Sequence, residues 1–128
     1  RKLAKRHQNI STSGNRAVFY ILCLNANADN PSHVGMTVEE DGIVLFYETM
    51  LDLGMGSGRQ RDTFVATTIL HEIGHQIGMG HIDDSRCIMS ESVEVPDSTH
   101  GSFVYVPDQW CTKELNAIQE IRDRLTAE

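Results

Sequence analysis

Apolar residues gather in two short runs early in the chain. Residues 17–24 form a continuous apolar run of strand length, which predicts a central strand buried on both faces. Residues 43–47 form a second such run, and residues 33–38 between them alternate between apolar and polar. Asp41-Gly42 is a hairpin signal, so 33–38 and 43–47 are predicted to be antiparallel neighbours, with the half-polar strand at the sheet edge.

A helical period follows a glycine-rich connector at residues 54–58. The helix is expected to begin at Asp62 or Thr63, since both residues are good N-caps. Its apolar arc, expected to pack on the sheet, contains Ala66, Ile69, Leu70, Ile73 and Ile77. The opposite arc contains Phe64, Thr68, His71 and His75. The helix is therefore predicted to have one packed face and one face that presents polar groups.

A final helix is predicted to begin near Asp108 or Thr112. Its apolar positions recur at helical spacing, which predicts a buried stripe on one side. The stripe consists of Leu115, Ile118, Ile121 and Leu125.

The stretch HEIGHQIGMGH carries the densest set of reactive groups, with three histidines and one glutamate. In a helix, His71 and His75 lie one turn apart and can hold one metal ion. Glu72 lies about 100° round the helix, where it borders the site without being a ligand. Gly78 can adopt the positive φ that ends a helix and returns His81 as a third ligand. Three protein ligands leave the fourth position of a tetrahedral Zn²⁺ open for water, as in catalytic sites.

This stretch resembles the HExxHxxGxxH motif of the metzincin clan of zinc endopeptidases. The resemblance implies an α+β fold, in which a small mixed sheet with an antiparallel edge packs on the zinc-binding helix. A methionine turn and a C-terminal helix follow, and Met89 is the candidate for the methionine under the metal. The resemblance also implies one catalytic domain over 1–128. Its N-terminal subdomain (1–78) would hold the strands and active-site helix, and its C-terminal subdomain (79–128) the third ligand and methionine turn.

The chain has three cysteines. Cys23 lies inside the first apolar run and is expected to be a buried free thiol. Cys87 and Cys111 flank the segment after the zinc motif, and they either pair or remain two further free thiols. A bridge would close a loop of about 25 residues and stabilise the fold by roughly 3–4 kcal/mol. It would also imply an oxidising compartment and so favour an extracellular location.

The spacing of Cys87, Met89 and Cys111 is similar to that of archaemetzincins, and Cys87-Ile88-Met89 resembles the methionine turn of adamalysins. Archaemetzincins hold a second zinc on four cysteines. Ile82 and Glu114 stand at two of those positions here. The resemblance therefore implies one catalytic zinc, with a disulfide in place of the second ion.

Metzincins bind extended substrate along an antiparallel strand at the rim of the cleft. The predicted edge strand occupies the corresponding place, and its free backbone donors and acceptors suit β-augmentation. An edge that meets only water is the alternative. The candidate substrate-binding residues are His33, Val34, Gly35, Met36, Thr37 and Val38. By the same resemblance, the acidic segment from Glu91 to Val95 forms a wall of the pocket just past the scissile bond.

The function implied is a zinc-dependent endopeptidase with one Zn²⁺, in which Glu72 activates the zinc-bound water as general base. Two alternatives are a non-catalytic zinc-binding interaction module and a fragment that is inactive without a missing N-terminal part. The formal charge of −7 argues against nucleic acid as a partner. No apolar run approaches the roughly 20 residues of a membrane span. We expect peptide or protein substrates, and we expect the chain to be a monomer.

Overall fold

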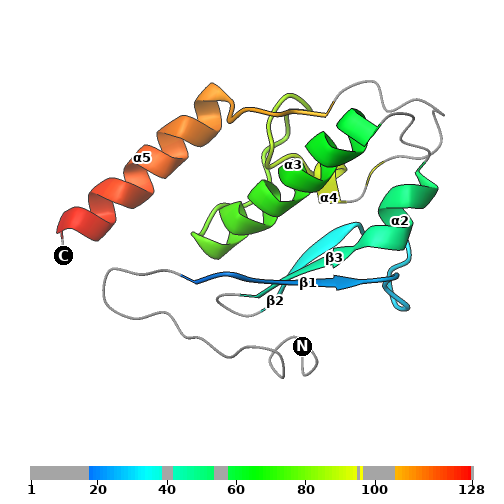
Figure 1. The fold of residues 1–128 in the computed structure, drawn as a ribbon. Helices are drawn as coiled ribbons and strands as arrows, with labels where there is room; N and C mark the ends of the chain where they lie inside the picture. The colour runs from blue at the N-terminus through cyan, green and yellow to red at the C-terminus, as the bar shows by residue number, and fades with distance from the viewer. Residues whose placement is uncertain (1–17, 39–41, 54–57, 95, 97–105, 128) are drawn as a thin grey trace.

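A computed structural model describes residues 18–38, 42–53, 58–94, 96 and 106–127 of the chain. Its strands are β1 (Tyr20–Leu24), β2 (Gly35–Val38) and β3 (Gly42–Phe46). Its helices are α2 (Tyr47–Asp52), α3 (Gly58–Gln76), α4 (Glu91–Glu94) and α5 (Thr112–Ala127). Helix α3 packs on β2 and β3, and α5 lies on the side of α3 away from the strands (Figure 1). These elements confirm the predicted α+β fold with a small mixed sheet.

β3 is the central strand of the described sheet, whose order is β1-β3-β2. It pairs with β1 in parallel and with β2 in antiparallel orientation. All five residues of β3 are buried, as expected of a strand with a neighbour on each side. The predicted antiparallel pairing is confirmed, and β2 lies at an edge among the described strands. Asp41 of the hairpin signal lies outside the described residues.

The prediction that the first apolar run forms the central strand is wrong. β1 begins at Tyr20 and lies at the other edge of the described sheet. Its burial alternates, so that Ile21 is 47% exposed. Cys23 is exposed as well, contrary to the predicted buried thiol. A continuous apolar run shows that a segment suits a strand, but the neighbours that cover each face come from elsewhere in the chain.

The short helix α2 follows β3 directly and was not indicated by the sequence pattern. Tyr47, which was expected to end the strand, is instead the first residue of this helix. Met50 of α2 is fully buried in the main apolar core. The other buried members of this core are Val34, Ile43, Leu45 and Phe64. The core therefore joins the sheet, α2 and α3 in one packed unit.

Helix α3 begins earlier than expected, at Gly58 rather than at Asp62 or Thr63. On its apolar arc Ile69 and Ile73 pack against the core, but Ala66 and Ile77 are exposed. The opposite arc is the more deeply buried one. The buried residues on this arc and directly beside it are Phe64, Thr67, Thr68, His71, Glu72 and Gly74.

The close approach of β2 explains why this polar arc is covered. A Cβ built on Gly35 would lie only 2.7 Å from Thr68 Cγ2 and 3.2 Å from Glu72 Oε1. The absence of a side chain at Gly35 thus lets the edge strand lie against the arc that carries the histidines. The simple division of α3 into a packed apolar face and an open polar face is wrong.

Helix α5 begins at Thr112, one of the two predicted starts. Its predicted buried stripe is wrong at both ends, because Leu115 is 53% and Leu125 is 68% exposed, whereas Ile118 and Ile121 are half-buried. Glu114 in the first turn is fully buried, and Cys111 just before the helix is joined to Cys87 by a disulfide with a Cα–Cα distance of 5.1 Å. The start of α5 is therefore fixed to the body of the domain, while the rest of the helix extends beyond it (Figure 1).

None of the described helices is long and apolar enough to cross a membrane.

We predict that the double substitution Cys87→Ser and Cys111→Ser lowers the free energy of unfolding by roughly 3 kcal/mol, because the bridge restricts the unfolded chain. Urea unfolding of the two proteins measures the difference. Cys23→Ser is the matched control, since Cys23 is exposed and lies outside the bridge. Equal stability of the double variant and the wild type would contradict the prediction.

Candidate metal centre

The end of α3 brings three histidines together. His71 and His75 lie one turn apart on the helix, which ends at Gln76. Gly78 has a φ of 101°, and its N–H donates to His75 O at 3.0 Å, while Met79 N–H donates to Gly74 O at 2.9 Å. This pair of bonds is a Schellman motif, which needs the left-handed residue that glycine provides. The chain reverses there and returns His81 to the same place.

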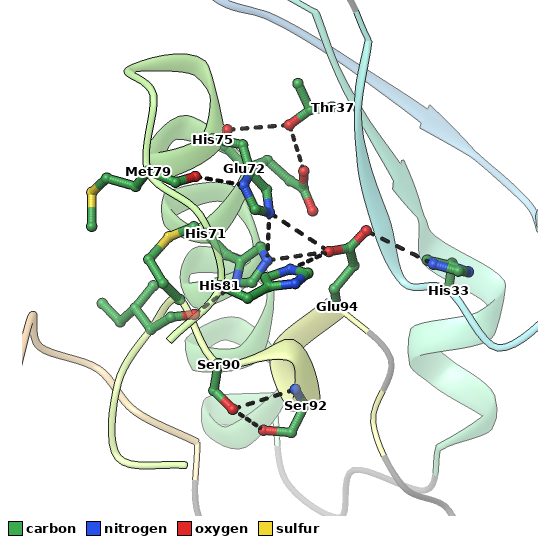
Figure 2. A network of polar contacts seen from close by, with 12 residues as sticks. His33, Thr37, His71, Glu72, His75, Met79, His81, Ser90, Ser92 and Glu94 are labelled. Atoms are coloured by element: carbon green, nitrogen blue, oxygen red, sulfur yellow. Dashed lines mark hydrogen bonds and ion pairs between the residues drawn. The ribbon is translucent and has the colours of Figure 1, made fainter. Parts of the chain in front are cut away.

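The imidazoles point their Nε2 atoms at a common centre (Figure 2). His71 Nε2 and His75 Nε2 are 3.1 Å apart, and one donor atom from each of the three histidines lies within 4.8 Å of the others. Zinc binds histidine nitrogen at about 2.0–2.1 Å, so two tetrahedral ligands are separated by roughly 3.3 Å. The histidine cluster therefore fits one zinc ion.

Backbone carbonyls set the tautomer of the two helical histidines. His71 Nδ1 lies 2.7 Å from Ile88 O, and His75 Nδ1 lies 2.9 Å from Met79 O. A carbonyl oxygen can only accept, so each Nδ1 carries the proton and donates it. Each Nε2 is left with a lone pair directed at the centre, which is the usual arrangement of metal-binding histidines.

Glu94, the last residue of α4, belongs to the same cluster and was missed as a candidate ligand. Its Oε2 lies 2.9 Å from His81 Nε2 and 3.4 Å from His71 Nε2. Burial opposes ionisation of Glu94, but the three histidines, which donate hydrogen bonds to it when their rings are protonated, outweigh burial and hold the pKa of this carboxyl well below its usual range. The hydrogen bond to Glu94 in turn raises the pKa of His75. No periodic spacing links Glu94 to the histidine motif, so the sequence offered only its acidic surroundings as a signal.

Glu72 lies beside the cluster and is fully buried. Its Oε2 accepts a hydrogen bond of 2.6 Å from Thr37 Oγ1 on the edge strand β2. Its Oε1 is buried and has no hydrogen-bond partner among the described residues. Burial raises the pKa of Glu72, the bond from Thr37 offsets part of that rise, and the nearby charge of Glu94 adds to it. The carboxyl is thus held at one oxygen and unpaired at the other.

The sequence matches the family model described as Matrixin over residues 22–109, more than half of the chain. The chain belongs to the matrixin family. Matrixins are a metzincin family, so the predicted membership of the metzincin clan is confirmed. The resemblances to archaemetzincins and adamalysins are limited to the spacing of residues around Cys87 and Met89. No curated protein and no solved structure matches the chain significantly.

The matrixin match includes the turn around Met89, which packs against Gly74 of α3. Met89 is fully buried, its carbonyl accepts from Ile82 N–H at 2.9 Å, and Ser90 N–H donates to Cys87 O at 3.2 Å. A Cβ built on Gly74 would overlap the sulfur of Met89. The thioether therefore occupies space that any other residue at position 74 would fill.

Glu114 holds this turn from the other side. Its Oε1 accepts from Ile88 N–H and Cys111 N–H, each at 2.9 Å, and its Oε2 accepts from Met89 N–H at 2.8 Å. The sulfurs of Cys87 and Cys111 are bonded to each other, and the Glu114 oxygens are occupied by backbone donors. Cys87, Cys111 and Glu114 therefore join the turn around Met89 to the start of α5.

We predict that Gly74→Ala lowers the free energy of unfolding by roughly 1–3 kcal/mol, since the added methyl group overlaps the sulfur of Met89. The greater helix propensity of alanine works in the opposite direction, by about 1 kcal/mol. Thermal and urea unfolding measure the net effect. Gly80→Ala is the control, because a Cβ there meets nothing within 4 Å. A Gly74→Ala variant at least as stable as the wild type would rule out the close contact.

Proposed function

We propose that this matrixin chain is a zinc-dependent endopeptidase. The observation that carries the proposal is the convergence of three histidine Nε2 atoms beside a buried carboxylate with one unpaired oxygen. In this proposal His71, His75 and His81 hold one zinc ion, the metal that matrixins use, and Glu72 is the general base. His75 is 22% and His81 is 39% exposed at the side chain, so the centre is reachable from solvent.

When bound, zinc supplies a Lewis acid that polarises the peptide carbonyl and makes water a nucleophile near neutral pH. Glu72 accepts the proton of the attacking water at Oε1 and delivers it to the leaving amine. Thr37 anchors Oε2, which keeps the carboxyl in one orientation. Burial raises the pKa of Glu72, which suits a group that must both accept and return a proton.

We propose that extended peptide substrates pair with the edge strand. β2 lies at an edge among the described strands, and Thr37 connects it to the proposed base. A substrate paired with this strand would place its backbone next to the base. The proposed binding segment consists of His33, Val34, Gly35, Met36, Thr37 and Val38. Within it, Val34 N–H already donates to Glu94 O, so substrate pairing would use the other backbone groups.

Met89 takes the place of the clan's methionine turn in this proposal, supported by its burial against Gly74. The proposed domain covers 1–128. The strands and α3 lie in its N-terminal part (1–78), and the third ligand, Met89 and α5 lie in its C-terminal part (79–128).

We predict that Glu72→Ala keeps zinc and fold but loses peptide cleavage by about 10²–10⁴-fold, because it removes the general base and no ligand. Zinc content, a thermal melt and cleavage of a casein-derived peptide library are measured in parallel. His75→Ala is the matched comparison, since it should lose stoichiometric zinc as well as activity. Equal cleavage by Glu72→Ala and wild type, with zinc retained, would exclude Glu72 as the base. Zinc binding by the wild type without any cleavage would favour a binding module.

We further predict that Thr37→Val moves the acid limb of the kcat/KM profile to higher pH. The hydrogen bond from Thr37 lowers the pKa of Glu72, so its loss raises that pKa further. A base works only when it is ionised, and a higher pKa therefore removes activity at a higher pH. Thr37→Ser retains the hydroxyl and should keep the wild-type profile. Coincident acid limbs for Thr37→Val and wild type would show that this bond does not tune the base.

A further inference from the structure

The carboxylate of Glu94 reaches the centre at which the three imidazoles converge (Figure 2). Its Oε2 lies 2.9 Å from His81 Nε2, 3.4 Å from His71 Nε2 and 3.7 Å from His75 Nε2. One oxygen atom thus contacts all three nitrogens that face the centre.

These separations are those of neighbouring ligands around one ion. Zinc lies about 2.0–2.2 Å from histidine nitrogen and carboxylate oxygen, so the edges of its tetrahedron are roughly 3.3 Å long. The three distances from Glu94 Oε2 lie on either side of that length, as does the 3.1 Å between His71 Nε2 and His75 Nε2. Glu72, by contrast, directs Oε2 to Thr37 and is not a member of the group whose donor atoms converge.

Two further contacts hold Glu94 in this position. Its backbone carbonyl accepts from Val34 N–H at 3.0 Å, which ties the end of α4 to the residue just before β2. Its other carboxylate oxygen, Oε1, lies 3.8 Å from His33 Nε2. The side chain is only 17% exposed, so it is not a freely rotating surface group. The backbone carbonyl of Glu94 is therefore hydrogen-bonded, and its half-buried carboxylate faces histidine nitrogens at both oxygens.

We infer that Glu94 is a fourth protein ligand of the metal. This inference rests on the proposed zinc site and adds a carboxylate at the position that a catalytic zinc leaves open for water. Four protein ligands make the resting site closed. At such a site, water or a peptide carbonyl would reach the metal either in place of the Glu94 carboxylate or as an additional ligand.

The experiment compares the zinc affinity of the wild-type chain (residues 1–128) with that of Glu94→Ala and Glu94→Gln, using competition with a chromophoric chelator. Visible absorption of the Co²⁺-loaded proteins reports the number and type of metal ligands. Loss of an outer-shell partner already costs about 10–100-fold in metal affinity, so loss of a direct ligand should weaken zinc binding at least ~10-fold. Glu91→Ala is the matched control, because Glu91 is exposed on the same short helix and lies outside the cluster. Glu94→Gln keeps the shape of the side chain should the alanine variant fail to fold.

Weaker zinc binding and an altered Co²⁺ spectrum in the Glu94 variants, with wild-type values for Glu91→Ala, support the inference. Unchanged affinity and spectrum in Glu94→Gln overturn it, and a wild type that binds no zinc overturns both the inference and the proposed site. Peptide cleavage by the wild type, measured alongside, separates the two proposals. If the Glu94 variants bind zinc more weakly but the wild type cleaves no peptide, Glu94 is a ligand and the peptidase proposal is rejected. If the wild type cleaves peptides but the Glu94 variants bind zinc normally, the peptidase proposal stands and Glu94 is not a ligand.

Discussion

Two buried polar residues at the candidate metal centre, His71 and Glu72, bond to segments distant in the chain and hold those segments in place. His71 and Glu72 are completely buried, and an unpaired polar group in that position would cost several kcal/mol. Ile88 O accepts from His71, and Thr37 donates to Glu72. The loop after the helix and the edge strand are therefore held against α3 by hydrogen bonds as well as by apolar contact.

The C-terminal segment also supplies hydrogen-bond partners to buried groups, here to backbone N–H groups. The first turn of α5 supplies a buried carboxylate, Glu114, to three backbone N–H groups around the turn that carries Met89. The bridge between Cys87 and Cys111 fixes the same place covalently. Leu115 and Leu125 of the same helix are largely exposed, so Glu114 and the disulfide at Cys111 are the main ties described between α5 and this turn.

Two carboxyls border the same histidines, and their surroundings move their pKa values in opposite directions. Burial raises the pKa of Glu72, whereas the imidazoles lower that of Glu94 despite burial. The proposed roles of the two carboxyls rest on geometry. Glu72 has one buried oxygen without a partner among the described residues, which suits the proposed base. Glu94 brings Oε2 to the three histidine nitrogens, which suits the proposed ligand.

The sequence by itself determined what depends on local spacing. His71, His75 and the reversal at Gly78 follow from the helical period and from the freedom of glycine at positive φ, and the β2–β3 pairing follows from the hairpin signal. Only the tertiary structure decided which apolar run is central, which arc of α3 is covered, and that Glu94 joins the histidines. Each of these depends on contacts between segments far apart in the chain, and no local period records which distant surface will cover a residue.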